Sequence, residues 1–273
     1  MTPTVLKIED TSFNYEKTRI FDHLNFEVSS GSIFCLFGPN GCGKSTLIEC
    51  ILGSLQLATG NIFINDKSIR SIRPVELAKY IGYVPQNHTK NFPYKVFDIV
   101  LMGRAAYTGP FSSPTDEDRK KAETALATLG ISHLSDKPYT QLSGGQTQLV
   151  LLARVLAQET PIILMDEPTA HLDFRHELII LETIVKLIKE KNISVIMATH
   201  FPNHAFYFEN SGINTKVALM NNQVFEAVGS PTEVLTEENM LKTFHIHSKL
   251  VSSTSNNKEI KGIIPTEVAT KTI

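Results

Sequence analysis

The feature that constrains this chain most is a glycine-rich stretch, GPNGCGKST, at residues 38–46. It has the form G-x-x-x-x-G-K-[ST], follows a short apolar run at 33–37 and leads into a segment with the apolar content of a packed helix. Glycines let the backbone turn its N–H groups inward without a Cβ in the way. A tight glycine turn with a surface lysine would explain neither the Lys-Ser-Thr ending nor the strand before it. The stretch therefore predicts a site for a chain of phosphates.

Each part of this loop has an expected role. The start of the helix adds partial positive charge, which favours an anion. Lys44 would reach the β- and γ-phosphates of a nucleotide, and the Ser45 hydroxyl would ligate Mg²⁺. The residues expected to contact the nucleotide here are Gly38, Pro39, Asn40, Gly41, Cys42, Gly43, Lys44, Ser45 and Thr46.

Composition limits the partners. The 273 residues carry a net charge of −2, which gives no reason to expect nucleic acid. No apolar run nears the roughly 18–20 residues of a membrane span, so work at a membrane would need a partner. The cysteines Cys35, Cys42 and Cys50 match no zinc spacing and indicate free thiols in a reducing compartment. Cys42, inside the loop, is the one expected to be open to alkylation.

Strand and helix patterns alternate along the chain, which predicts an α/β fold with a mostly parallel sheet. The expected strands are at 4–30, 61–65, 81–86, 162–165 and 194–199, with a hairpin at 217–228 about Asn221-Asn222. The expected helices are at 73–76, 93–102 (ended by Gly103), 115–130 (started by a Thr115–Asp118 capping pair), the segment after Ser143-Gly144-Gly145, 176–191 and 232–244. From about residue 249 the chain is polar, and we expect partial disorder there.

Two adjacent carboxylates, Asp166 and Glu167, end a buried apolar strand. Carboxylates at such a place are costly unless a cation balances them. Mg²⁺ is such a cation, so Asp166 would hold the ion and Glu167 would orient and deprotonate an attacking water. A helix cap beyond the strand is the plainer alternative.

A second anion site is indicated by Leu142-Ser143-Gly144-Gly145-Gln146, before a predicted helix. LSGGQ, with the phosphate loop upstream and Asp166-Glu167 downstream, resembles the ABC-type ATPases over roughly residues 4–245. The resemblance implies a P-loop NTPase (RecA-like) core over about 1–87 and 158–248, an N-terminal antiparallel β subdomain, an inserted helical subdomain at about 88–157, and a tail at 249–273. It also implies a head-to-tail homodimer, in which each ATP lies between the loop of one subunit and Ser143 and Gly145 of the other.

Further family positions match one by one. Tyr15 lies where the family has an adenine-stacking aromatic, although a core tyrosine on an alternating strand is the alternative. Gln86 matches the glutamine that touches Mg²⁺ and the attacking water. Asp173, in Ala170-His171-Leu172-Asp173, matches the loop at the dimer seam, and His200 matches the switch histidine that contacts the γ-phosphate. The other histidines carry no such expectation, and His245 and His247 are expected on the surface.

Two segments depart from the family pattern. Thr147-Gln148-Leu149 replaces a charged residue followed by Gln-Arg, and Phe201-Pro202 follows His200 in place of the commoner Asp-Leu or Asp-Met. The expected consequences are altered contacts along the helix after LSGGQ and a stiffer hinge after the switch histidine.

Stretches 91–104, 115–118 and 229–236 resemble the branch of ATPases that serve importers of iron-siderophore, haem and vitamin B12 complexes. The resemblance implies two integral membrane permease subunits, an indirect partner in a substrate-binding protein, and a place at the cytoplasmic face of the membrane. A groove for the permease would be lined by Phe92, Pro93, Val96, Phe97 and Met102, which would equally suit packing of the helices on their own core.

Other functions stay open at this point. Molybdate or tungstate is the nearest alternative cargo, because no residue of such a subunit touches cargo. A soluble ABC ATPase that acts in assembly, for example of iron-sulfur clusters, is the second possibility. A nucleotide-binding module without hydrolysis is the third, and the presence of Glu167 and His200 argues against it.

Overall fold

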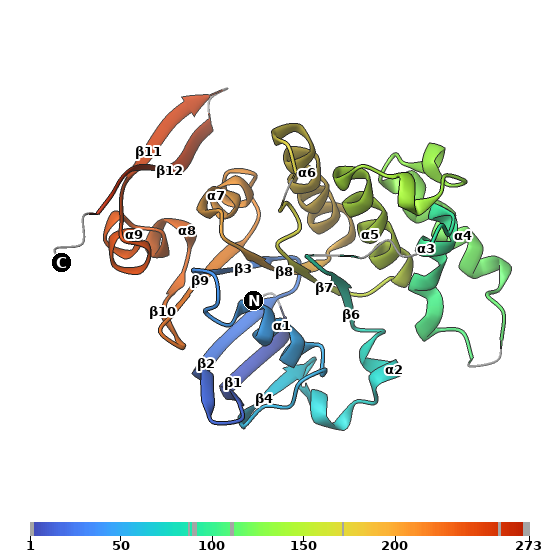
Figure 1. Ribbon diagram of the computed structural model, residues 1–273, viewed down its shortest axis with the longest axis horizontal. Helices are drawn as coiled ribbons and strands as arrows, with labels where there is room; N and C mark the ends of the chain where they lie inside the picture. Colours follow the sequence, from blue (N-terminus) through green and yellow to red (C-terminus); the bar gives the residue numbers. More distant parts are fainter. Residues whose placement is uncertain are drawn as a thin grey trace. The chain divides into compact units, whose positions relative to one another are not determined.

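The computed structural model describes residues 3–269 apart from 87, 89–91, 110–111, 171 and 256–257. The chain divides into two compact units. Residues 1–71 and 187–273 form the first unit, and residues 72–186 form the second. Figure 1 labels the strands and helices of both units. The mixed α/β architecture predicted from the sequence is confirmed, while the exact borders of a core and an inserted subdomain stay a prediction.

The first unit contains an antiparallel sheet built from the N-terminal residues. Its strands are β1 (Thr4–Tyr15), β2 (Thr18–Ser29), β4 (Thr59–Ile64) and β5 (Lys67–Ser68), in the order β2-β1-β4-β5. Alternate side chains such as Leu6 and Ile8 are buried, which is the pattern of strands with one face on a core. The predicted antiparallel N-terminal region is therefore confirmed.

A second set of strands in the first unit runs mostly parallel. β3 (Ile33–Phe37) pairs in parallel with β8 (Ser194–Thr199) on one side and β9 (Thr215–Asn221) on the other. β10 (Val224–Gly229) returns antiparallel to β9. All residues of β3 and β8 are buried, as expected for strands covered on both faces. The turn between β9 and β10 has positive φ angles at Asn222 and Gln223, one residue later than predicted.

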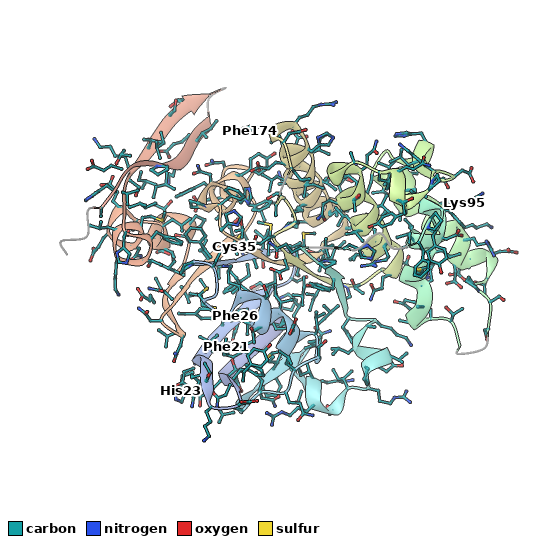
Figure 2. All side chains as sticks on the ribbon, in the orientation of Figure 1. Phe21, His23, Phe26, Cys35, Lys95 and Phe174 are labelled. Atoms are coloured by element: carbon teal, nitrogen blue, oxygen red, sulfur yellow. The ribbon has the colours of Figure 1, made fainter. Side chains whose placement is uncertain are left out.

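Aromatic packing joins these two sets of strands. Phe26 of β2 stacks on Phe34 of β3 with ring centroids 4.2 Å apart, and Phe225 of β10 meets Phe26 edge-on at 5.7 Å. Figure 2 labels Phe26 and the buried Cys35 among the side chains of this core. The helices of the first unit are α1 (Lys44–Ile51), α7 (Pro202–Asn210), α8 (Pro231–Val234) and α9 (Glu237–Phe244).

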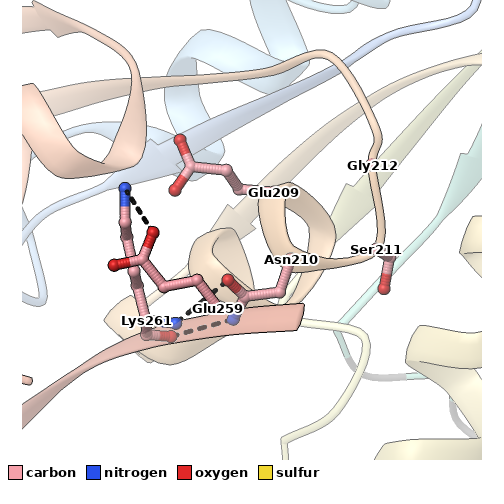
Figure 3. A pocket seen from close by; sticks show the side chains of 6 residues that line it. All are labelled: Glu209, Asn210, Ser211, Gly212, Glu259 and Lys261. Atoms are coloured by element: carbon pink, nitrogen blue, oxygen red, sulfur yellow. Dashed lines mark hydrogen bonds and ion pairs between the residues drawn. The ribbon is translucent and has the colours of Figure 1, made fainter. Parts of the chain in front are cut away.

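The C-terminal segment is ordered as a hairpin of β11 (Ile246–Ser255) and β12 (Lys258–Val268). The predicted disorder from about residue 249 is wrong for the described residues. Two asparagines of α7 hold β12. The Asn203 amide exchanges two hydrogen bonds with the backbone of Ile263, at 2.9 and 3.1 Å, and the Asn210 amide does the same with Lys261, at 2.9 and 3.1 Å. Figure 3 shows the Asn210 contact beside a hollow of about 410 Å³.

The second unit contains one parallel strand pair and most of the long helices. β6 (Ile81–Val84) pairs with β7 (Ile162–Asp166). The helices are α2 (Pro74–Leu77), α3 (Val96–Leu101), α4 (Asp116–Thr128), α5 (Gly144–Gln158) and α6 (Phe174–Lys191), whose last residues belong to the first unit. α3 begins three residues later than predicted, because Lys95 is still extended and bridges to Pro138. Gly103 does not end the helical segment, since a 3₁₀ turn continues over Met102–Ala106.

A buried ion pair ties the helices of the second unit together. Arg104 is 4% exposed, donates to the Asp118 carboxylate at 2.8 Å and donates to the Ala157 carbonyl at 2.9 Å. Asp118 also completes the predicted capping box with Thr115 at the start of α4. The Arg104 contact, helped by Thr115, lowers the pKa of Asp118 to about 2. The helices therefore share a charged anchor as well as an apolar core.

Candidate nucleotide site

The phosphate loop connects β3 to α1, as predicted. Gly41 and Gly43 have φ angles of +79° and +108°, a region that residues with a Cβ rarely adopt. Gly38 is required for space, because a Cβ there would lie 2.2 Å from the Met220 carbonyl oxygen. The neighbouring strand β9 thus presses against the loop and fixes its course.

Lys44 is folded back into its own loop. Its side chain is buried, and Nζ donates to the carbonyls of Gly38 at 2.8 Å and Pro39 at 3.0 Å. Among the described residues of its unit, no carboxylate pairs with this ammonium group. A buried ammonium group in contact with carbonyl oxygens and, at 3.9 Å, with the Cys42 sulfur is favourable for an arriving anion. The loop therefore has the charge and the cradle for a phosphate chain.

Cys42 lies in the same loop but is not a ready nucleophile. Burial raises the pKa of its thiol, and the nearby Lys44 ammonium opposes that rise only in part. The thiols of Cys35 and Cys50 are shielded further, and burial raises the pKa of each to about 12. All three cysteines are free, as predicted.

His200 leaves the parallel strands at the same edge as the loop. Phe37, the last residue of β3, pairs with Thr199, the last residue of β8, so the loop and His200 start side by side. His200 is exposed, and the Phe201 ring lies 4.0 Å from its ring. Thr199 Oγ1 accepts from the Phe201 backbone N–H at 3.1 Å, and Phe201 caps α7 ahead of Pro202. His200 and the loop therefore follow neighbouring parallel strands at one edge, while the contact of His200 with a γ-phosphate stays a prediction.

Tyr15 is not a core residue. It is 47% exposed at the end of β1 and meets Phe13 edge-on at 4.9 Å. The adjoining strand β2 reaches the loop, since a Cβ on Gly43 would lie 2.9 Å from Ile20 Cγ2. The exposed ring on a hairpin that touches the loop favours the stacking alternative over the core alternative.

In the second unit, Gln86 and Glu167 meet. Val84 pairs with Met165, so the residues that follow β6 and β7 leave at one edge. The Gln86 amide donates to Glu167 Oε2 at 2.8 Å. Glu167 has a φ of +46°, a strained conformation for a residue with a Cβ, and strain of this kind concentrates at functional sites. Asp166 is buried at the end of β7, as predicted.

Ser143 begins α5 with a reciprocal capping box. Its Oγ accepts from the Gln146 backbone N–H at 3.3 Å, and its own N–H donates to the Gln146 side chain at 3.2 Å. Ser143 is exposed, and Gly145 is buried. Thr147, Gln148 and Leu149, which differ from the family pattern, are all buried and so do not form part of a charged surface. Thr147 donates its hydroxyl proton to the Ser143 carbonyl at 2.8 Å and so supports the cap.

Asp173 caps the next helix, α6, and is 67% exposed at its side chain. Its partner is His176, a residue that the sequence analysis did not single out. The only sequence signal for it is the Asp-x-x-His spacing at a predicted helix start. His171, which the family pattern includes, lies outside the described residues.

Each unit thus groups part of the predicted set at the end of parallel strands. The first unit combines a phosphate cradle, a buried cation and a histidine. The second combines a carboxylate with a glutamine, plus a capped helix start. The groups of the first unit are suited to binding a polyphosphate, and the carboxylate of the second unit is suited to accepting a proton from water. No helix among the described residues is long and apolar enough to cross a bilayer.

Comparison with known proteins agrees with this chemistry. The profile described as ABC transporter matches residues 21–170. The molybdate import ATP-binding protein MolC of Haemophilus influenzae is 38% identical over 242 residues, 88% of each chain. The iron(3+)-hydroxamate import ATP-binding protein FhuC of Bacillus subtilis is 32% identical over 255 residues, 93% of each chain. A solved inward-facing transporter of metal-chelate ABC type has a TM-score of 0.84, 35% identity, and coverage of 96% of this chain and 97% of the other.

Proposed function

The chain belongs to the ABC transporter family, and we propose that it is the ATP-hydrolysing subunit of an importer for an iron-siderophore, haem, cobalamin or related metal complex. The observation that carries the ATPase part is the Gln86–Glu167 contact of the second unit, present in a chain whose first unit contains a closed phosphate loop. A module that only bound nucleotide would need the first feature and not the second.

The first unit supplies the phosphate site. Backbone N–H groups of residues 38–46 and the Lys44 ammonium hold the phosphates, with Lys44 exchanging its loop carbonyls for phosphate oxygens. Tyr15 stacks on the adenine ring. Mg²⁺ would be held by oxygens of Ser45, Gln86 and Asp166, which are the ligand types that this ion prefers, and it would offset charge on the phosphates.

Hydrolysis needs a base beside the terminal phosphate. Glu167 accepts the proton of the attacking water, and the Gln86 amide, which already donates to that carboxylate, keeps it oriented. His200 donates to the γ-phosphate and so distinguishes ATP from ADP. The stiff Phe201-Pro202 segment that follows β8 holds His200 at the edge of the strands.

The second unit supplies a surface for another copy of the chain. Ser143 and Gly145 contact the γ-phosphate of the partner subunit in a head-to-tail dimer. Phe174, beside Asp173, is 92% exposed, and Leu178 one turn later is 44% exposed. Large apolar side chains this exposed favour coverage by a partner. ATP closes the dimer, and hydrolysis removes the γ-phosphate bridge and opens it.

A membrane partner is supported by the region of α3. Phe92 and Met102 are 63% and 48% exposed, and a hollow of about 380 Å³ lies over Asp98, Leu101, Met102 and Pro114. Val96, in contrast, is fully buried and belongs to the core, so the predicted groove is shared between the two alternatives. We assign the exposed part to two integral permease subunits, which would receive cargo from a substrate-binding protein and hold this chain at the cytoplasmic face of the membrane.

Molybdate is an alternative cargo that one of the comparisons favours. The MolC relative imports molybdate by its name and is 38% identical, whereas FhuC is named for iron hydroxamate and is 32% identical. A soluble assembly ATPase is less favoured, because the named relatives are import subunits. Reconstitution of the chain with its permease in vesicles tests both points, with ATP turnover as the readout and ferric hydroxamate, cobalamin and molybdate as cargoes. Stimulation by none of several metal complexes or oxyanions contradicts the importer proposal.

Glu167→Gln tests the ATPase assignment directly. The variant keeps the hydrogen-bonding shape but cannot take a proton, so it should bind ATP, lose turnover by at least about a hundredfold and accumulate as an ATP-bound dimer. Light scattering after gel filtration measures the dimer. Rapid residual turnover counts against Glu167 as the base.

A further inference from the structure

His176, on the first turn of α6, contacts two segments of the second unit at once. One is Asp173, three residues earlier, and the other is the start of α5 at Gly145. Neither contact follows from the family positions assigned above. Together they connect the two pieces of this unit that the proposed function places at the dimer seam.

The contact with Asp173 is made by side chain and backbone. The His176 ring nitrogen Nδ1 lies 2.8 and 2.9 Å from the two Asp173 carboxylate oxygens, and the His176 backbone N–H donates to Oδ1 at 2.9 Å. Nδ1 acts as the donor, since an ionised carboxylate can only accept. These bonds lower the pKa of Asp173, with the backbone bond as the largest cause. The carboxylate is therefore fixed in direction although its side chain is 67% exposed.

The contact with Gly145 is a matter of space. A Cβ added to Gly145 would lie 2.4 Å from His176 Cδ2 and 2.6 Å from Cγ, closer than real Cβ contacts come. Gly145 does not have a positive φ, so the ring of His176 and not the backbone conformation requires glycine there. At neighbouring Gly144 the nearest atom to such a Cβ is Leu172 Cδ2, at 3.6 Å, from the segment just before Asp173.

We propose that His176 is a positioning residue that locks the Asp173 carboxylate and the Ser143–Gly145 turn into one rigid surface for the second copy of the chain. This inference rests on the proposed function, because it presumes that both segments face the partner. His176 does not touch nucleotide or reacting atoms. Its ring sets the distance between the two segments, and its Nδ1 sets the direction of the carboxylate.

Dimer formation by the Glu167→Gln chain with ATP gives the first test. Adding His176→Ala should weaken the ATP-bound dimer by roughly tenfold, the effect of losing a hydrogen bond to a charged group. His176→Asn should restore most of it, because the Asn amide nitrogen occupies the place of Nδ1, whereas His176→Gln puts its amide at the place of Nε2 and should not. ATP binding to the protomer should stay unchanged in all three. Equal dimer strength in all variants overturns the proposal, and failure of Glu167→Gln alone to dimerise overturns the proposed function instead.

Thermal unfolding gives a second test that needs no nucleotide. Gly145→Ala should lower the melting temperature by several degrees in the wild-type background, because the ring and the new methyl group overlap. In the His176→Ala background the same substitution should cost nothing, since alanine is the better helix former. An equal loss in both backgrounds shows that the ring does not set the space at Gly145 and overturns the proposal.

Discussion

The phosphate loop and the Ser143–Gly145 turn both place glycines at the start of a helix, yet they use them differently. In the loop, Gly41 and Gly43 adopt left-handed backbone angles, and the loop closes around its own buried Lys44. In the turn, Gly144 and Gly145 are helical residues of α5. The side chain of Ser143 caps the helix start by accepting a hydrogen bond from the Gln146 backbone N–H. The first is a closed cradle and the second is an open one.

This difference teaches which site is complete by itself. The loop contains the buried ammonium group of Lys44 and is fixed by its neighbour Met220, so one protomer has the parts needed to bind phosphate. Ser143 Oγ accepts a hydrogen bond from the Gln146 N–H, and a hydroxyl group of this kind can also donate its own proton to an acceptor such as a phosphate. With no buried cation of its own, the turn is suited to complete a site that another chain has already filled.

The largest effects should come from Lys44→Ala and Ser143→Arg. Each should lower ATP turnover by at least about a hundredfold, because each removes or blocks a donor to the phosphates. They should differ in binding. Lys44→Ala weakens the uptake of a fluorescent ATP analogue by the protomer, while Ser143→Arg leaves it unchanged and prevents dimer formation. If Ser143→Arg also loses nucleotide binding by the protomer, the contrast between closed and open cradles is wrong.

Alanine at Gly38 of the loop and at Gly144 of the turn should change stability in opposite directions. Gly38→Ala should lower the free energy of unfolding by about 2 kcal/mol, because its methyl group meets the Met220 carbonyl at 2.2 Å. Gly144→Ala meets nothing closer than 3.6 Å in a helix and should raise that free energy by roughly 0.5 kcal/mol. Urea titrations of the two variants provide the measurement, each serving as the control for the other. If both variants change the free energy of unfolding in the same direction, the distinction between the closed loop and the open turn is wrong.

The enclosed character of the loop should also be visible in the chemistry of Cys42. Burial raises the pKa of this thiol, so less thiolate is present at any given pH, and alkylation by iodoacetamide should be slow at pH 7. The rate should rise roughly tenfold from pH 7 to pH 8, because the thiolate fraction grows with pH below the pKa. Mass spectrometry locates the label, ATP should slow its formation, and Cys42→Ala should abolish it. A rate that is flat between pH 7 and pH 9 indicates a lowered pKa and an open loop.

The smallest effect should come from Tyr15→Ala, at the border of the closed cradle. Loss of one stacked ring should weaken ATP binding by roughly five- to tenfold, and Tyr15→Phe should keep the affinity. The melting temperature should stay the same, because the side chain is already 47% exposed. If Tyr15→Ala lowers the melting temperature but leaves the affinity for ATP unchanged, Tyr15 has a purely structural role.

The parts that sequence analysis predicts well are those whose physics is local. The phosphate loop, the Thr115–Asp118 capping box and the buried strand before Asp166 follow from a few adjacent residues, and the structure contains each of them. The contact of Gln86 with Glu167 was not predicted, and it arises because the parallel strands β6 and β7 end at a common edge.

The parts that it missed depend on contacts between distant segments. The polar sequence from about residue 249 suggested partial disorder, yet β12 is held by hydrogen bonds from α7, which no local pattern reveals. Val96 was left open between a permease groove and the core of the helices, and its burial decides for the core through packing that its own sequence neighbours do not reveal. His176 stayed unnoticed because its second contact, with Gly145, spans about thirty residues of sequence.

The attachment of the C-terminal hairpin has a consequence for how its sequence can vary. Asn203 and Asn210 bond to the main chain of Ile263 and Lys261, so these bonds do not depend on which side chains those two positions carry, although the Ile263 side chain is itself buried and needs an apolar residue. Proline is the exception, because it has no N–H to give. The exposed positions of β12 should thus tolerate substitution better than Ile263, while the amides of Asn203 and Asn210 are needed to hold the strand.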